Sequence, residues 1–238
     1  MNDKNKVIWV TGAGSGIGRS AALEFARSGF SVAASSRRLS PLETLEREVE
    51  HEGLMFHLVP CDISSPSRVE DAVNEITSIA GDIDCLINNA GITSFKPAEE
   101  NSLKEIRDII ETNLLGSIYA IKAVLPGMIK RKRGTVINVL STAAIEVLKG
   151  SSAYAASKAG LLAYTDVLRE EVRKYNIRII DIIPGPTRTP MWPEEMMREH
   201  GSKMMDPHEV ARMMLDVYIN SKTMVTERVI LKPIGGSI

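Results

Sequence analysis

The chain has 238 residues, and its 29 Lys and Arg side chains nearly balance its 30 Asp and Glu side chains. A balanced charge creates no overall field that would draw the protein to nucleic acid or to an anionic membrane, so we expect neither as a partner. Apolar residues make up 44% of the chain and charged residues 25%, which is the composition of a globular domain. We therefore expect one soluble domain that spans residues 1–238.

The N-terminus and the cysteines indicate an intracellular protein. Residues 1–6 are polar, and the short apolar run that follows cannot form the core of a signal peptide or a membrane span. Cys61 and Cys85 both lie in apolar, strand-like sequence. Two buried thiols are a better interpretation than a disulfide or a metal site. We expect a cytoplasmic location and no bound metal.

Short β-branched runs alternate with longer segments in which apolar residues stand three and four apart. This pattern predicts a Rossmann-type, doubly wound α/β domain, with a seven-stranded parallel sheet covered by helices on both faces. The expected strands are residues 7–11, 31–35, 55–60, 85–88, 135–140, 178–183 and 225–231. The expected helices are residues 17–27, 41–52, 66–80, 102–129, 154–175 and 207–219.

A glycine-rich turn follows the first expected strand. Residues 11–18 read Thr-Gly-Ala-Gly-Ser-Gly-Ile-Gly, and a helix is expected to begin at once. Glycines there let the backbone turn tightly and approach a pyrophosphate, which predicts a nucleotide site; a tight strand-to-helix connection is the alternative. The spacing, Gly-x-x-x-Gly-x-Gly, differs from the Gly-x-Gly-x-x-Gly of the common dinucleotide fingerprint.

The end of the second expected strand indicates which nucleotide is bound. An NAD enzyme usually places Asp or Glu there, against the ribose hydroxyls. This chain has Ser35, Ser36, Arg37 and Arg38 instead. Guanidinium groups bind a 2′-phosphate through charge-assisted hydrogen bonds, whereas a carboxylate would repel it. The pattern favours NADP(H) over NAD(H), unless the two arginines only decorate an exposed loop.

Lys130, Arg131, Lys132 and Arg133 form a run of like charge between the expected helix 102–129 and the strand after it. No internal repeat, low-complexity tract or linker accompanies the run. We interpret it as a solvated turn rather than as a docking patch.

Tyr154 and Lys158 are four residues apart in an expected helix, so the phenol and the amine lie on one face. A nearby ammonium group and the positive charge of an oxidised nicotinamide both favour the phenolate. They would lower the pKa of the tyrosine from its ordinary value of about 10. Such pairs also arise by chance, so the pair is informative only together with the other motifs.

The one long irregular stretch, residues 184–205, follows the C-terminal end of the sixth expected strand, where open α/β sheets bind their ligands. Such a segment is usually a lid or a binding loop, and we place the lid at about residues 186–205. It carries five of the 11 methionines and also Trp192. Two interpretations stay open: a flexible cover over an apolar or flat substrate, or the apolar face of a short packing helix.

Six features of the chain have a characteristic order and spacing. They are residues 11–18, Asn88-Asn89-Ala90-Gly91, Asn113, Ser141, Tyr154 with Lys158, and Pro184-Gly185. Together they resemble the short-chain dehydrogenase/reductase family over the whole chain. The resemblance implies a homotetramer or homodimer and a catalytic tetrad of Asn113, Ser141, Tyr154 and Lys158. We assign cofactor binding to about residues 1–100, and catalysis and substrate binding to about residues 101–238.

The resemblance implies a role for each member of the tetrad. Tyr154 donates its proton to the substrate carbonyl oxygen as hydride arrives from the nicotinamide, and Ser141 hydrogen-bonds the same oxygen. Lys158 binds the nicotinamide ribose and lowers the tyrosine pKa. Asn113 holds a water that passes protons toward the lysine; alternatively, it is a polar helix residue satisfied by the backbone.

The resemblance also implies a set of cofactor contacts, with Asp62 at the adenine and Thr187 near the nicotinamide amide. Asp62 could instead cap a turn, and Asn88 and Asn89 could be turn residues. The expected cofactor-binding residues are Gly12, Ser15, Gly16, Ile17, Gly18, Arg37, Arg38, Asp62, Ile63, Asn89, Ala90, Gly91, Tyr154, Lys158, Pro184, Gly185 and Thr187. The expected substrate contacts are Ser141, Tyr154 and Trp192.

The substrate class stays open between branches of the family. The tetrad, the arginine position and the length are similar to those of 3-oxoacyl-[acyl-carrier-protein] reductases, the activity we expect first, on an acyl thioester or another small carbonyl. Residues 189–192 and 226–238 resemble sepiapterin-reductase-like enzymes and small-alcohol dehydrogenases instead. Where carrier-docking enzymes have an arginine, this chain has Tyr175, beside Arg173 and Lys174. A non-catalytic NADP-sensing protein is disfavoured because Tyr154 and Lys158 are both present.

Overall fold

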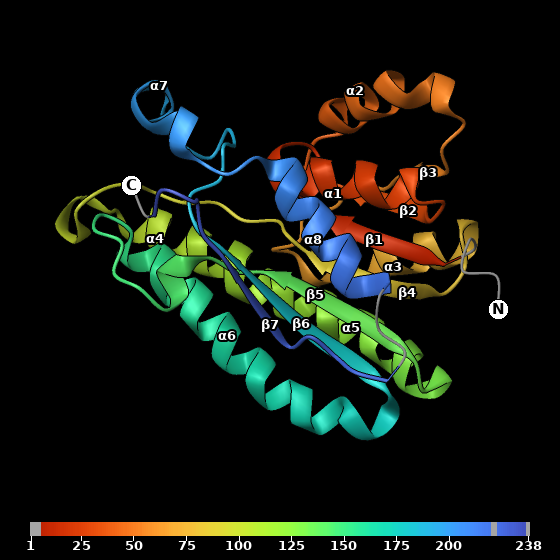
Figure 1. Cartoon of the computed structure of the whole chain (residues 1–238). Coiled ribbons are helices and arrows are strands. Elements are labelled where there is room, and N and C mark those ends of the chain that lie inside the picture. Colours follow the sequence, from red (N-terminus) through yellow and green to blue (C-terminus); the bar gives the residue numbers. More distant parts are fainter. Residues whose placement is uncertain (1–5, 220–222, 237–238) are drawn as a thin grey trace.

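Seven parallel strands form one sheet (Figure 1). They are β1 (Val7–Thr11), β2 (Ser31–Ser35), β3 (Phe56–Leu58), β4 (Ile83–Asn88), β5 (Gly134–Val139), β6 (Ile177–Pro184) and β7 (Arg228–Leu231). The computed structural model describes residues 6–219 and 223–236. The strand order β3-β2-β1-β4-β5-β6-β7 reverses direction between β1 and β4, the point at which such sheets bind ligands. The predicted doubly wound α/β fold is confirmed.

The strand limits differ from the predicted ones at the ends. β3 is confined to Phe56–Leu58, instead of residues 55–60, because it pairs only with the middle of β2. β7 begins at Arg228 instead of residue 225, because Arg228 is the first residue of this segment that pairs with β6, opposite Asp181. β4 begins at Ile83, opposite Val7, instead of at residue 85. Apolar runs show that a strand is buried but not where its pairing begins.

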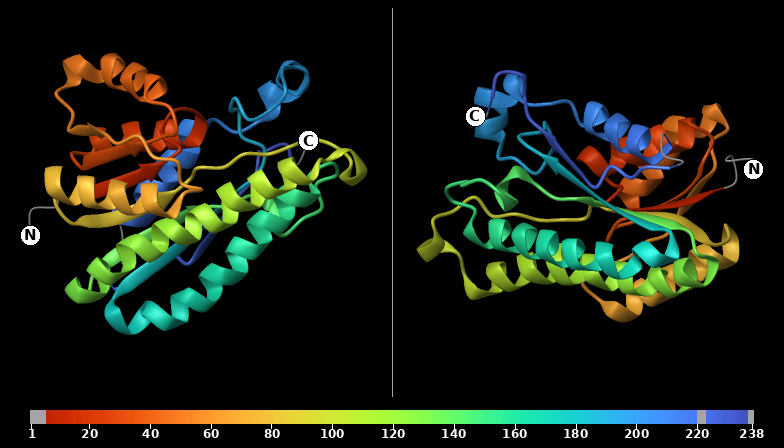
Figure 2. Two further views of the ribbon diagram at one scale, coloured as in Figure 1. Left: turned by 180° about the vertical axis from the view of Figure 1, so that it is seen from behind. Right: turned by 60° about the horizontal axis from the view of Figure 1, so that its bottom comes forward.

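Helices cover both faces of the sheet (Figure 1, Figure 2). They are α1 (Gly16–Arg27), α2 (Ser40–Val49), α3 (Pro66–Ile79), α4 (Leu103–Ile110), α5 (Gly116–Arg131), α6 (Ser152–Val172), α7 (Glu194–His200) and α8 (Pro207–Ile219). Phe25, Leu42 and Met214 bury α1, α2 and α8 in the apolar cluster on one face. Ile121 and Leu168 belong to a second cluster, with α3, α5 and α6 on the other face.

The predicted helix 102–129 is interrupted. Ser102 begins α4 with a capping box, in which its side chain and that of Glu105 each accept from the other residue's backbone N–H. Glu111–Leu115 then form a π-helical turn, with Asn113 fully buried in it, before α5 continues the helix. The segment Leu103–Arg131 is long and apolar enough to cross a membrane by length and composition alone. In this fold α5 packs against α3 and β4 instead.

Residues 186–205 are not irregular throughout, so that part of the prediction is wrong. They contain α7 and a 3-10 turn at Gly201–Lys203, and Figure 1 shows α7 standing away from the sheet. Thr187 and Met205 pair in an isolated bridge, and Met205 N donates to Pro186 O at 3.0 Å. The two ends of this segment, which we call the lid, are therefore held together.

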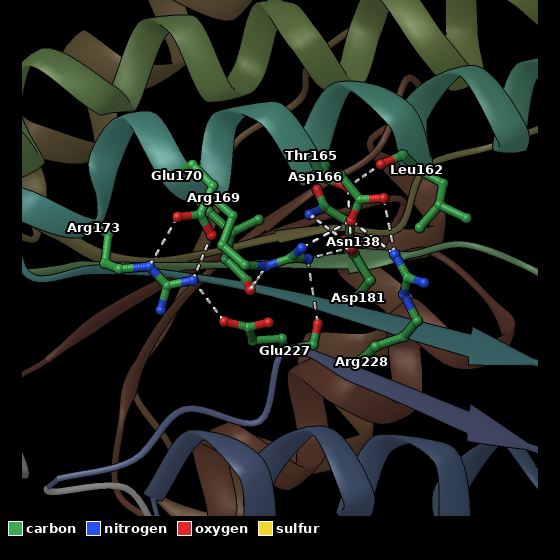
Figure 3. Close-up of polar contacts among 11 residues, drawn as sticks. Asn138, Leu162, Thr165, Asp166, Arg169, Glu170, Arg173, Asp181, Glu227 and Arg228 are labelled. Atoms are coloured by element: carbon green, nitrogen blue, oxygen red, sulfur yellow. Dashed lines mark hydrogen bonds and ion pairs between the residues drawn. The ribbon is translucent and has the colours of Figure 1, made fainter.

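A buried polar network fixes α6 to the sheet (Figure 3). Asp181 on β6 is fully buried, and Asn138 of β5 donates to its carboxylate at 3.1 Å. Thr165 Oγ1 and Arg169 Nη2, both on α6, donate to the same carboxylate at 3.0 and 2.7 Å. These three donors, one of them charged, offset the desolvation of Asp181 only in part, because burial still raises the pKa of its carboxyl group. The helix that carries Tyr154 is thus anchored along its C-terminal half.

Candidate active site

A cavity of about 550 Å³ lies at the carboxyl ends of the central strands. Two predicted site residues, Gly18 and Asn113, are not among the residues that line it. The predicted residues that do line it are Gly12, Ser15, Gly16, Ile17, Arg37, Arg38, Asp62, Ile63, Asn89, Ala90, Gly91, Ser141, Tyr154, Lys158, Pro184, Gly185, Thr187 and Trp192. The fold therefore brings the nucleotide motif and the Tyr-Lys pair, more than 100 residues apart, to one cavity.

The glycine turn has the geometry of an anion cradle. Gly12 has a φ of 68°, and a Cβ there would lie 2.7 Å from Ala90 Cα, so both the conformation and the space require glycine. Gly16 has a φ of 54° and begins α1. The first turn of α1 has no acidic side chain, and the Ser15 hydroxyl makes no cap bond to it. The N–H groups and the dipole of α1 therefore favour an anion at this end of the cavity.

Gly18 lies behind the glycine turn and leaves space for the side chain of Asn89. A Cβ on Gly18 would lie 2.2 Å from Asn89 Nδ2. That amide donates to Thr11 O at 3.0 Å and to Gly12 O at 3.2 Å, while the backbone N–H of Asn89 donates to Thr11 Oγ1 at 3.0 Å. Gly18 thus makes room for the side chain that joins the glycine turn to the loop after β4. Its place explains why it does not line the cavity.

Arg37 and Arg38 follow β2 at the nucleotide end of the cavity, and both side chains are exposed. Within the described part of the chain, neither forms an ion pair. The Ser36 hydroxyl donates to Arg38 O and closes the turn that presents them. Two guanidinium groups without a carboxylate partner suit a phosphate.

Asp62 caps a turn, as one of its two interpretations holds. Its carboxylate accepts from Ser64 N at 3.1 Å and from Ser64 Oγ at 2.7 Å, so it caps the turn before α3. It also lines the cavity. Beside it, Ile63 packs so closely on Gly116 that a Cβ there would lie 2.3 Å from Ile63 Cγ1, which brings the start of α5 against this wall.

Tyr154, Ser141 and Lys158 meet at the other end of the cavity. Tyr154 is buried, and its phenol is hydrogen-bonded to the side chain of Ser141, two residues after β5. Lys158 is also buried, and its Nζ lies 5.8 Å from the centre of the Tyr154 ring. The ammonium donates to Val139 O at 2.8 Å. A carbonyl oxygen placed beside the phenol would meet two hydroxyl groups.

Burial dominates the titration of this pair. It raises the pKa of Tyr154, and the hydrogen bond with Ser141 offsets that rise only in part. Burial also lowers the pKa of Lys158 to about 8. The expectation that Lys158 lowers the tyrosine pKa is therefore not met, because the effect of burial on the phenol prevails. A raised pKa keeps the phenol protonated, the form that can donate a proton.

Asn113 lies behind the cavity wall. Its Nδ2 donates to Ile92 O at 2.9 Å and to Ser157 Oγ at 3.0 Å, and its Oδ1 accepts from Ile92 N at 2.8 Å. Ser157 Oγ in turn donates to Tyr154 O at 2.7 Å. The side chain is thus satisfied largely by backbone, as the alternative interpretation holds. It ties the loop after β4 to the first turn of α6, which carries Tyr154.

The lid touches the opposite wall through two stacked aromatic rings. The Trp192 and Phe95 rings lie 4.8 Å apart between centres, with an angle of 14° between their planes. Trp192 Nε1 donates to Thr187 O at 3.0 Å, which orients the ring. Leu148 and Met196 also line the cavity and add apolar surface to it.

Sequence patterns missed Phe95, Leu148 and Glu146, which line the substrate end of the cavity. All three lie in loops, where no apolar periodicity exists to single them out. The order of the motifs offered one indication. Residues shortly after Asn89-Ala90-Gly91 and shortly after Ser141 follow two site motifs, so they were expected to lie near the active-site cavity. Loop contacts of this kind depend on the tertiary approach of the segments.

Comparisons with known proteins show which family the chain belongs to. Residues 6–200 match the family model described as short chain dehydrogenase. A sepiapterin reductase of Chlorobaculum tepidum is 33% identical over 98% of this chain and 98% of its own length. An alcohol dehydrogenase of Thermococcus sibiricus, solved with 5-hydroxy-NADP, has a TM-score of 0.86 at 26% identity over 96% of this chain and 97% of its own. A metagenomic short-chain oxidoreductase, solved with NADP, has a TM-score of 0.85 at 27% identity over the same shares, 96% and 97%. The predicted family is confirmed: the chain belongs to the short-chain dehydrogenases.

Proposed function

We propose that the protein is an NADP(H)-dependent oxidoreductase that transfers a hydride between the nicotinamide and a carbonyl or secondary alcohol. One observation carries the proposal. A single cavity has an anion cradle with two unpaired arginines at one end, and the hydrogen-bonded Tyr154 and Ser141 pair with Lys158 at the other. The relatives solved with 5-hydroxy-NADP and with NADP support this choice of cofactor.

The cavity fits a dinucleotide with a 2′-phosphate. The glycine turn and the N-terminus of α1 would hold the pyrophosphate, Arg37 with Arg38 the 2′-phosphate, and Asp62 the adenine end. Pro184, Gly185 and Thr187 would surround the nicotinamide, together with Ala90 and Gly91. When bound, NADPH supplies the hydride.

The protein residues supply the proton and hold the substrate. Tyr154 donates its proton to the carbonyl oxygen, and Ser141 hydrogen-bonds the same oxygen and keeps it within reach. The raised pKa of Tyr154 suits the reducing direction, because the phenol stays protonated at neutral pH. A Lys158 with a pKa of about 8 is charged at pH 7 and would bind the ribose hydroxyls. Asn113 would keep the turn that carries Tyr154 in place.

For the substrate we favour a flat carbonyl compound over an acyl thioester on a carrier protein. The stacked rings of Phe95 and Trp192 line the cavity with aromatic surface, and the relative from Chlorobaculum tepidum is named for sepiapterin, a flat bicyclic compound. Arg173 is engaged by Glu170 at 2.6 Å and Glu227 at 2.8 Å, so its charge is not free for an acidic carrier. This order reverses the one expected from the sequence.

Nucleotide titration tests the cofactor. Wild-type protein should bind NADPH roughly 10- to 100-fold more tightly than NADH, because hydrogen bonds to a charged group contribute about 1.5–3 kcal/mol. The double change Ser36→Asp with Arg37→Ala removes one guanidinium and adds a ribose-hydroxyl acceptor, so the preference should shift toward NADH. Arg47→Ala is the control, since it removes the same charge from α2 outside the cavity. Equal wild-type affinities for the two nucleotides would contradict the proposal.

A panel of carbonyl compounds tests the substrate. Loss of NADPH absorbance should be faster with flat bicyclic carbonyls, sepiapterin among them, than with acetoacetyl thioesters. The opposite order would restore the 3-oxoacyl reductase function, and no turnover with any carbonyl would favour a nucleotide sensor.

The assembly and location are proposals as well. A homodimer or homotetramer is implied by the family resemblance, and the exposed side chains of Val167 on α6 (62%) and Ile230 on β7 (50%) are candidates for burial in its interfaces. Cys61 and Cys85 are both buried and free, which suits a reducing compartment such as the cytoplasm.

A further inference from the structure

A second cavity, of about 480 Å³, lies at the edge of the sheet opposite the active site. Gly134 and Ile177, the first residues of β5 and β6, line it, as do Tyr218 near the end of α8 and Val225 before β7. The active site lies beyond the last residues of the same two strands. Open α/β sheets bind their ligands at the carboxyl ends of the strands. The proposed function therefore does not use this second cavity, which lies at the amino ends.

The charges around this second cavity have one dominant sign. Among the described lining residues there is one carboxylate, that of Asp84. Six side chains are basic: Lys6, Lys132, Arg133, Arg169, Arg173 and Arg178. The whole chain carries no such excess, since its net charge is −1. The positive potential is therefore local to this cavity.

Two of the six cations are already neutralised by the chain. Arg169 pairs with Asp181 at 2.7 Å and with Asp166 at 2.8 Å. Figure 3 shows Arg173 held in the same way, by Glu170 and Glu227. These arginines belong to the network that anchors α6.

Arg178 is different, because its charge has no carboxylate partner among the described residues. The side chain is half-buried. Its Nε and Nη2 donate to Thr135 Oγ1 at 3.0 and 2.8 Å, and Nη2 also donates to Tyr218 O at 3.1 Å. Its Nη1 is buried without a hydrogen-bond partner. The guanidinium also lies 5.3 Å from the centre of the Tyr218 ring. A partly buried guanidinium that meets neutral acceptors and an aromatic face, but no carboxylate, is stabilised further when an anion approaches.

Lys132 and Arg133, from the basic run between α5 and β5, add two more cations. Lys132 has no ion pair within the described chain, and Arg133 approaches Asp84 only at 3.4 Å. The Asp84 carboxylate also accepts from Val7 N at 3.2 Å, so it is shared. Two residues of the run interpreted from the sequence as a solvated turn thus line a cavity.

We propose that this cavity is a binding site for a small phosphate-bearing anion, held by Lys132, Arg133 and Arg178. Guanidinium groups bind phosphate oxygens through paired, charge-assisted hydrogen bonds, and an ammonium adds a compact charge. Pyrophosphate and phosphorylated metabolites share this chemistry. A cavity of about 480 Å³ has room for either.

The test measures pyrophosphate binding by calorimetry at constant ionic strength, on protein saturated with NADP⁺ so that the nucleotide cradle is filled. Wild-type protein should bind one pyrophosphate per chain. The double variant Lys132→Asn with Arg133→Gln should bind it at least about tenfold more weakly, given the strength of charged hydrogen bonds. Asn suits position 132 because Lys132 has a φ of 51°, which Asn tolerates.

The controls distinguish specific binding at the cavity from nonspecific attraction of the anion to positive charge. Lys130→Ala removes one charge from the last turn of α5 but does not line the cavity, so binding should stay within about twofold of wild type. Arg178→Gln should abolish binding and Arg178→Lys should restore part of it. Should Arg178→Gln fail to fold, the double variant decides alone. Equal binding by wild type, the double variant and the control, or no binding by wild type, would overturn the proposal. A phosphorylated sugar that competes with pyrophosphate would identify a metabolite as the ligand.

Discussion

Tyr154 is a residue on which burial and hydrogen bonding act in opposite directions. Burial raises its pKa and the Ser141 contact lowers it, with burial prevailing. Tyr154→Phe removes the proton donor and keeps the ring, so reduction should fall at least about 100-fold while NADPH still binds. Steady-state rates and fluorescence titration measure the two effects. Near-normal turnover would rule out Tyr154 as the acid.

The raised pKa of Tyr154 also bears on how the rate of carbonyl reduction depends on pH. A phenol with a raised pKa stays protonated above the ordinary value of 10, so it should not limit reduction between pH 6 and 9. Lys158 should limit it, because the amine loses its charge as pH rises through about 8. We expect the rate of carbonyl reduction to decline above about pH 8. A profile that is flat to pH 10 would contradict this assignment.

Lys158 carries a cost for folding. A charged amine whose pKa falls from 10.5 to about 8 on burial destabilises the folded protein by up to about 3 kcal/mol wherever it is charged in both states. That penalty is full below pH 8 and is relieved as pH rises toward 10.5, where the unfolded state also loses the proton. Lys158→Met should therefore raise the free energy of unfolding at pH 7 and raise it less at pH 10. Urea unfolding at the two pH values measures this; a loss at pH 7 would show that the Val139 O contact outweighs burial.

The lid is the element that should select substrates by size. Trp192→Ala removes the ring stacked on Phe95, so the Michaelis constant should rise more for bicyclic carbonyls than for small ketones. Steady-state kinetics on both classes measure the ratio. Met55→Ala is a control on an exposed apolar residue far from the lid in the chain. An equal rise for all sizes would show that the lid only packs.

Helix α6 depends on the network around Asp181. Asp181→Asn replaces an acceptor by a donor opposite Arg169 and leaves that arginine without its buried partner, so the free energy of unfolding should fall by about 3 kcal/mol. Thr165→Val removes one neutral donor and should cost about 1 kcal/mol. Urea unfolding compares the two. A larger loss for Thr165→Val would contradict the dominance of the ion pair.

The elements that sequence patterns could predict are those defined by continuous burial. β1 and β2 match their predicted ranges because each apolar run ends at a polar or glycine-rich turn. The π-helical turn around Asn113 was not predictable, because one additional residue per turn hardly changes an apolar periodicity. Phe95 was missed for another reason: its contact with Trp192 exists only when two distant loops meet.

At the scale of the whole molecule, motif order predicted more than local pattern did. The glycine turn and Tyr154 were placed in one site because the order and spacing of the six motifs resemble those of a known family. The basic cavity at the opposite edge could not be predicted, since Lys132 and Arg178 come together only through the pairing of β5 with β6.

Assembly offers the remaining prediction. Val167 is 62% exposed on the outer side of α6, and Val167→Glu should shift a homotetramer or homodimer to a smaller species if that side is an interface. Light scattering after gel filtration measures the mass. Met55→Glu, 45% exposed before β3, is the matched control and should leave the mass unchanged. A wild-type monomer would refute the oligomer outright.

The bridge between Thr187 and Met205 has a consequence for how this scaffold can change. The bridge holds the two ends of the lid side by side, so residues 188–204 form a loop whose ends are already joined. Such a loop can be exchanged without a change in the rest of the fold. Lengthening a flexible loop costs only about 0.6 kcal/mol for each doubling once its ends are joined. A longer or shorter segment could therefore replace the residues between Thr187 and Met205. The opening of the cavity would then change in size, while the catalytic residues would stay in place.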